Sequence, residues 1–142
     1  MANKSKAAGN RFEKVVCDVF REAGWTANRL RSFLIEGEPD LYATTNGLLI
    51  EVQAKERQNL NVHKTLVDLI RAQGLIPGSD FATPAVVFKH VVKTGDTGRR
   101  MQEGPVTITL PLDDFLILVR TSSESGVDLD SLADKIAERM KT

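Results

Sequence analysis

Two carboxylate side chains, Asp40 and Glu51, stand at the ends of predicted strands in the first half of the chain. Asp40 follows a turn, and Glu51, Gln53 and Lys55 alternate along the next predicted strand. Because successive side chains of a strand point to opposite faces, these three residues share one face. Carboxylates that converge repel each other, and a divalent cation that prefers oxygen ligands, Mg²⁺ or Mn²⁺, would resolve this conflict. Such an ion activates water and stabilises charge on a phosphate group, so the pattern predicts metal-dependent phosphate chemistry.

A hairpin has to bring Asp40 beside Glu51 for this chemistry. Residues 41–43 are predicted to form a short strand, and residues 48–52 the strand that returns. Between them lies Asn46-Gly47, the strongest two-residue signal for a hairpin. The apolar run over 48–52 is nearly continuous, which is typical of a strand buried on both faces. The sequence therefore predicts that the two carboxylates meet at one end of a sheet.

Apolar periodicity predicts the remaining elements, in the order α-β-β-β-α-β followed by a further strand and helices. Helices are expected over residues 9–23, 61–73, 111–119 and 129–140, and further strands over 25–34, 85–92 and 106–110. Residues 1–8 are expected to form a flexible basic arm, residues 93–104 a polar loop, and residues 121–128 a linker to the C-terminal helix. This order predicts an α/β fold in which the 142 residues form a single domain.

The composition is that of an ordinary globular protein, with 42% hydrophobic and 27% charged residues. The single cysteine, Cys17, cannot form a disulfide within the chain and lies in an apolar helical pattern, so we expect it to be buried. The sequence has no apolar run long enough to cross a membrane, and its first ten residues lack the apolar core of a signal peptide. We therefore expect a cytoplasmic protein with no membrane association.

The formal net charge is zero, but the basic residues are unevenly distributed. One basic group lies in the first third of the chain, a second spans residues 89–100, and acidic residues collect near the C-terminus. A neutral protein with a basic face can bind DNA, although solvated surface charge explains such a distribution equally well. The candidate DNA-binding residues are Lys4, Lys6, Arg11, Arg29, Arg31 and Lys89.

The chain resembles the PD-(D/E)xK nuclease superfamily in Pro39-Asp40 and Glu51-Val52-Gln53, which a short hairpin separates. Its opening residues 6–13, followed by an apolar helix and Ala23-Gly24-Trp25, are similar to the start of archaeal-type and phage Holliday junction resolvases. The resemblance implies a restriction-endonuclease-like fold, with a mixed central sheet flanked by helices. It also implies a homodimer that uses Mg²⁺ or Mn²⁺ to cut four-way DNA junctions.

Within this resemblance Asp40 and Glu51 hold the ion, and Glu13 completes the metal site from the first helix. The family pattern is Glu-x-Lys, and Gln53 stands where the lysine belongs. Three outcomes stay open: Gln53 places the attacking water, Lys55 substitutes for the missing lysine, or the site is degenerate and slow. Rival hypotheses are a related nuclease for linear or single-stranded DNA, a catalytically inactive DNA-binding module, and a structural protein.

Overall fold

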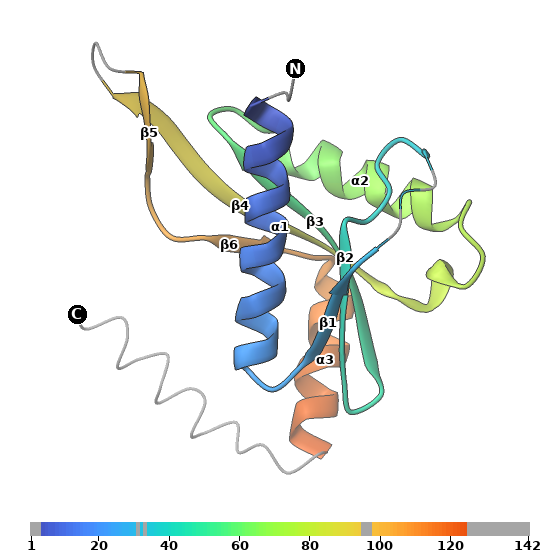
Figure 1. Cartoon of the computed structure of the whole chain (residues 1–142). Coiled ribbons are helices and arrows are strands. Elements are labelled where there is room, and N and C mark those ends of the chain that lie inside the picture. The colour runs from blue at the N-terminus through green and yellow to red at the C-terminus, as the bar shows by residue number, and fades with distance from the viewer. Residues whose placement is uncertain (1–3, 31, 33, 95–97, 125–142) are drawn as a thin grey trace. The chain divides into compact units, whose positions relative to one another are not determined.

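A computed structural model of the chain describes residues 4–30, 32, 34–94 and 98–124 (Figure 1). It divides into two compact units, Met1–Leu110 and Pro111–Thr142. The first unit contains the sheet, the helices α1 and α2, and the 3₁₀ helix η1 (Ser79–Phe81). In the second unit the structure describes helix α3 (Leu112–Glu124), which carries two aspartates in its first turn, where the helix dipole favours negative charge.

The first unit is built on a sheet of six strands in which both parallel and antiparallel pairs occur. The strand order is β1-β2-β3-β4-β5, and β6 also pairs with β4. Only the β3–β4 pair among these is parallel, because helix α2 connects the two strands across one face. The strands are β1 (Thr26–Arg29), β2 (Leu41–Thr45), β3 (Leu48–Arg57), β4 (Thr83–Thr94), β5 (Arg99–Gln102) and β6 (Thr107–Thr109).

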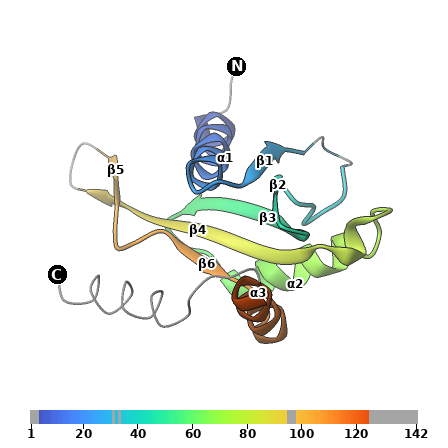
Figure 2. The ribbon, with the colours of Figure 1, turned by 90° about the horizontal axis from the view of Figure 1, so that it is seen from below.

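Helix α1 (Lys4–Glu22) covers one face of the sheet and α2 (Val62–Gln73) the other (Figure 2). α1 buries Phe12, Val16 and Cys17, as its apolar spacing predicted. This mixed sheet between helices is the architecture predicted for a restriction-endonuclease-like domain, and the element order α-β-β-β-α-β is confirmed. Among the described residues, no helix is both long enough and apolar enough to cross a membrane.

Strand β3 lies at the centre of the core. Its residues 50–54 are all buried, which confirms the prediction of a strand covered on both faces. The predicted hairpin that joins β2 to β3 is also present. Asn46 and Gly47 both have positive φ, at 46° and 80°, which is the backbone of the type I′ turn that matches strand twist.

Several predicted boundaries were wrong. α1 begins at Lys4, so residues 4–8 extend the helix rather than form a flexible arm, because nothing in their sequence breaks a helix. β4 continues through residues predicted as a polar loop and pairs with β5, since register with a neighbouring strand outweighs the glycines nearby. α3 continues to Glu124 through part of the predicted linker, and the predicted helix over 129–140 lies outside the described residues.

The turn before Asp40 is fixed against α2 at Gly37. This glycine has a φ of +82°, and a Cβ atom there would lie 2.7 Å from the backbone carbonyl oxygen of Asp68. Gly47 has a similar φ of +80° but open space around it. The two glycines therefore share the same backbone requirement and differ in their surroundings.

We expect Gly37→Ala to destabilise the fold more than Gly47→Ala, and urea denaturation of both variants tests this. Gly47→Ala should cost about 1–2 kcal/mol, the usual penalty of an L-residue in the left-handed region. Gly37→Ala should cost roughly 1–3 kcal/mol more, because the backbone of α2 must also move away. Equal losses in the two variants would contradict the tight contact between this turn and α2.

Candidate active site

The candidate site forms where β3 continues beyond the end of β2. The register of the two strands stops at the pair Leu41–Val52, so residues 53–57 of β3 have no β2 partner. Asp40 stands in the gap. Its backbone N–H donates to the carbonyl oxygen of Val52 at 2.8 Å, and its Oδ2 accepts a hydrogen bond from the Ala54 N–H at 2.9 Å.

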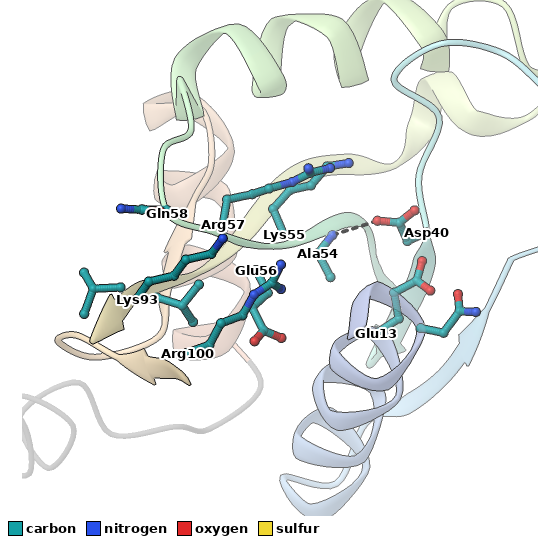
Figure 3. Close-up of a pocket in the computed structure, with 12 residues that line it drawn as sticks. Glu13, Asp40, Ala54, Lys55, Glu56, Arg57, Gln58, Lys93 and Arg100 are labelled. Atoms are coloured by element: carbon teal, nitrogen blue, oxygen red, sulfur yellow. Dashed lines mark hydrogen bonds between the residues drawn. The ribbon is translucent and has the colours of Figure 1, made fainter. Parts of the chain in front are cut away.

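Glu13 of α1 lies beside Asp40. Figure 3 shows the two carboxylates as neighbours on the same side of the pocket. Glu13 Oε2 accepts a hydrogen bond from Arg29 Nη2 at 2.9 Å, and the same nitrogen donates to Asn10 Oδ1 at 3.0 Å. α1 and β1 together therefore hold the glutamate against the aspartate.

The proximity of the two acids changes how Asp40 titrates. Burial raises the pKa of Asp40 from its usual 3.8 to about 7, and the Glu13 carboxyl contributes to this rise. The Ala54 N–H and the ammonium of Lys55 oppose it by favouring the carboxylate form. A carboxylate pair of this kind, with little water around it, is stabilised by a cation.

Basic side chains line the rest of this pocket. Lys55 and Arg57 come from the open edge of β3, and Lys93 and Arg100 from the β4–β5 hairpin. Figure 3 shows the acids on one side of the pocket and the hairpin residues on the other. The pocket thus has an acidic side and a basic side, which is a charge distribution compatible with phosphodiester chemistry.

Glu51 does not join this pocket, which corrects the prediction that it converges with Asp40. Its carboxylate is buried and accepts hydrogen bonds from Gln73 Nε2 at 2.9 Å and from Ser79 Oγ at 3.0 Å. Glu51, Gln53 and Lys55 do share one face, but it is the face covered by α2. Asp40 instead stands in a bend at the sheet edge, where its side chain lies toward α1.

Gln53 is the β3 residue beside Asp40, since the preceding pair in the register is Leu41–Val52. It is buried, and its Nε2 donates to the backbone carbonyl oxygen of Glu38. Its Oε1 is buried without a hydrogen-bond partner among the described residues. Gln53 lines a separate pocket on the α2 side, which shares Lys55 and Arg57 with the Asp40 pocket.

Within the described part of the chain, no three His, Cys, Asp or Glu side chains are grouped closely enough to hold a metal ion. The reason is that Glu51 faces α2, which leaves Glu13 and Asp40 as the carboxylates of the pocket. Buried amide oxygens are also ligands for hard cations, and an unpartnered one is costly. The two carboxylates that line the Asp40 pocket are oxygen ligands of the kind a hard divalent cation takes, whereas the orphaned Gln53 oxygen belongs to the separate pocket on the α2 side.

The predicted DNA-binding residues are scattered. Arg29 is paired with Glu13, and Lys89 lies 4.0 Å from Glu56 in a small pocket that Arg11 also lines. The side chains of Lys4 and Lys6 and the whole of Arg31 lie outside the described residues. The basic residues of the Asp40 pocket that sequence reasoning did not select are Arg57, Lys93 and Arg100. For Lys93 and Arg100 the signal was the basic group over residues 89–100, but the sequence placed both residues in a predicted loop and so did not predict their position.

The chain is similar to solved structures but to no family model and no curated protein. The solved structures that it is similar to include the Holliday junction resolvase Hjc of Archaeoglobus fulgidus, an archaeal hyperthermophile, at 25% identity and a TM-score of 0.41. That match covers 58% of this chain and 65% of the resolvase, which is less than two thirds of either.

The raised pKa of Asp40 predicts how the stability of the metal-free protein depends on pH. Because the folded state binds the proton more tightly than the unfolded state, Asp40 destabilises the fold increasingly as pH rises from about 4 to about 7. Asp40→Asn removes this penalty and keeps an oxygen for the Ala54 N–H. In EDTA, the stability of the variant relative to the natural chain should increase by roughly 2–3 kcal/mol between pH 5 and pH 8. Urea denaturation at the two pH values measures it, and an unchanged difference would exclude a protonated Asp40.

Proposed function

We propose that this chain is a metal-dependent DNA endonuclease that hydrolyses phosphodiester bonds in branched DNA, in the manner of a Holliday junction resolvase. The observation that carries the proposal is the Glu13–Asp40 carboxylate pair, which shares a pocket with Lys55. The resemblance of the N-terminal helix and of Pro39-Asp40 to the PD-(D/E)xK nucleases supports the same reading.

Asp40 and Glu13 would hold a divalent ion, Mg²⁺ or Mn²⁺. Gln53 Oε1 lines the neighbouring pocket on the α2 side, and it would be a third donor if its side chain turned toward Asp40. When bound, the ion would supply an activated water and stabilise charge on the phosphate. Arg29 holds Glu13 beside Asp40 through its 2.9 Å ion pair. Lys55 reaches the pocket around the open edge of β3, where its ammonium can orient the attacking water or contact a phosphate oxygen.

The position of Gln53 changes which residues correspond to the family pattern. Gln53 and Lys55, rather than Glu51 and Gln53, are the alternating β3 residues that follow the last β2–β3 pair, Leu41–Val52, and Lys55 lines the Asp40 pocket. On this assignment the pattern Glu-x-Lys falls on Gln53-Ala54-Lys55, so the lysine is present and a carboxylate is missing. We infer that the chain departs from the family in metal binding and not in the residue that places the water.

Junction specificity and a homodimer are parts of the proposal that come from the resemblance. Symmetric cleavage of a four-way junction requires two active sites related by twofold symmetry, which a homodimer supplies. Contacts to the phosphate backbone would dominate binding, because they fix the position of the DNA without reading its sequence.

A catalytically inactive DNA-binding module is the second candidate, and one observation favours it. The amide of Gln53 carries no charge where the family pattern has a carboxylate, and two carboxylates bind a divalent ion more weakly than three. Such a module would keep the basic side of the pocket and lose turnover.

We expect a labelled four-way junction to be nicked symmetrically in the presence of Mg²⁺ or Mn²⁺, and not in EDTA. A linear duplex of the same sequence should stay intact. Asp40→Asn and Lys55→Ala should each lower the cleavage rate by at least about a hundredfold, as expected for losing a metal ligand or a water-orienting group. Glu51→Gln is the matched control, and it should keep the rate at temperatures where it remains folded.

Each outcome separates the candidates. Cleavage of both DNAs would favour a less specific nuclease, and binding without cleavage would favour the inactive module. A loss of activity in Glu51→Gln, with an unchanged melting temperature, would contradict the assignment of Glu51 to the α2 network.

Gln53→Glu tests the assigned correspondence directly. A third carboxylate beside Asp40 should tighten Mn²⁺ binding by about tenfold or more, because each added charge strengthens a site for a hard cation. Isothermal titration calorimetry of the full chain measures the affinity, with Glu51→Gln as the variant that should leave it unchanged. If Gln53→Glu binds Mn²⁺ no better than the natural chain, Gln53 does not belong to the metal site.

A further inference from the structure

The β4–β5 hairpin carries two basic residues, Lys93 and Arg100, that form no ion pair with any of the residues that the structure describes. Lys93 and Arg100 are directly opposite each other in the antiparallel register and are exposed to solvent. Like charges at directly opposed positions destabilise a strand pair. No ion pair within the described part of the hairpin offsets this repulsion, so an anion bound between the two side chains would stabilise it.

Several basic side chains elsewhere in the described residues lie close to a carboxylate, whereas these two do not. Arg21, Arg29, Lys64 and Arg71 each lie within 4.0 Å of a carboxylate, and so does Lys89. Across the described residues, no such ion pair involves Lys93 or Arg100. The two cations are therefore available to a ligand, whereas each of the five basic side chains just named has a carboxylate partner within the fold.

The position of the hairpin pair relative to the acids indicates the ligand. Lys93 and Arg100 line the same pocket as Glu13 and Asp40, and Figure 3 shows both side chains extending from the hairpin toward the acidic side. Ala54 and the open edge of β3 lie between the two sides. A ligand that contacts both sides needs one phosphate group at a metal ion held by the acids. It also needs a second anionic group, a short distance along the same molecule, at Lys93 and Arg100. The backbone of a nucleic acid strand has this repeat.

We propose that Lys93 and Arg100 form a subsite for the DNA phosphate that neighbours the one to be cut. This inference rests on the proposed nuclease function and adds to it the direction in which the strand crosses the pocket. The strand runs from Glu13 and Asp40, along the β3 edge at Lys55, to the hairpin. Arg100 can contact two oxygens of one phosphate through its planar guanidinium, and Lys93 supplies a point charge.

Equilibrium binding of a fluorescent four-way junction to the full chain tests the subsite, with Ca²⁺ or EDTA in place of Mg²⁺. Lys93→Ala and Arg100→Ala should each weaken binding by about tenfold, as for the loss of one charged hydrogen bond. Each should also lower the slope of log affinity against log salt by about 1. Lys64→Ala and Arg71→Ala on α2 are the matched controls, and they should leave affinity and slope unchanged.

A second measurement distinguishes the loss of one specific contact from a general loss of binding-competent protein. Each phosphate beside the cut site is replaced in turn by an uncharged methylphosphonate, and binding to the natural chain is compared with binding to Lys93→Ala/Arg100→Ala. One substituted position should weaken binding to the natural chain by about tenfold and leave binding to the double variant unchanged.

Two results would overturn the inference, and they are distinguishable. If the natural chain binds DNA and the hairpin variants lose no more affinity than the α2 controls, the subsite is wrong and the proposed function stands. If the natural chain binds neither the junction nor a linear duplex, both the subsite and the proposed function fail.

Discussion

The pairing of β2 with β3 ends at Leu41, apart from the backbone hydrogen bond from Asp40 to Val52. Beyond that point the Asp40 carboxylate takes the place of the missing strand. It accepts the hydrogen bond of the Ala54 N–H at 2.9 Å, which would otherwise be an unpaired donor at an open sheet edge. That bond holds the carboxylate in a largely buried position beside Glu13. The rest of the pocket depends on this placement, since the basic side chains that line it would otherwise surround only a bare strand edge.

The local electrostatics follow from the same constraint. Burial raises the pKa of Asp40 toward neutrality, and the nearby Glu13 raises it further, so the neutral form of this carboxyl persists to higher pH than that of an exposed aspartate. Arg29 holds Glu13 from the β1 side, and Lys55 partly offsets the charge of Asp40. The fold therefore tolerates two neighbouring acids because basic side chains surround them at the rim of the Asp40 pocket. This distribution of charge would suit a ligand that carries both a metal ion and phosphate groups.

The carboxylate of Glu51 shows the other way in which this protein accommodates a buried charge. Gln73 at the end of α2 and Ser79 in η1 donate hydrogen bonds to its two oxygens, so the charge is fully partnered. These bonds connect the central strand to the segment that leads into β4. Two carboxylates close together in sequence thus have different roles. One stabilises the contact between β3 and the α2 side, and the other remains open to ligands in the pocket.

The sequence by itself determined the order of the elements, the Asn46-Gly47 hairpin and the pairing of a helix glutamate with Asp40. These depend on local patterns, turn chemistry and the resemblance in the first half of the chain. Because side chains alternate between the two faces of a strand, the sequence also predicted correctly that Glu51 and Gln53 share a face. Only the tertiary structure decided that α2 covers this face, because strand periodicity does not specify which helix packs on which side. It also decided that a hairpin brings Lys93 to the pocket, since pairing between distant strands depends on contacts that no local pattern records.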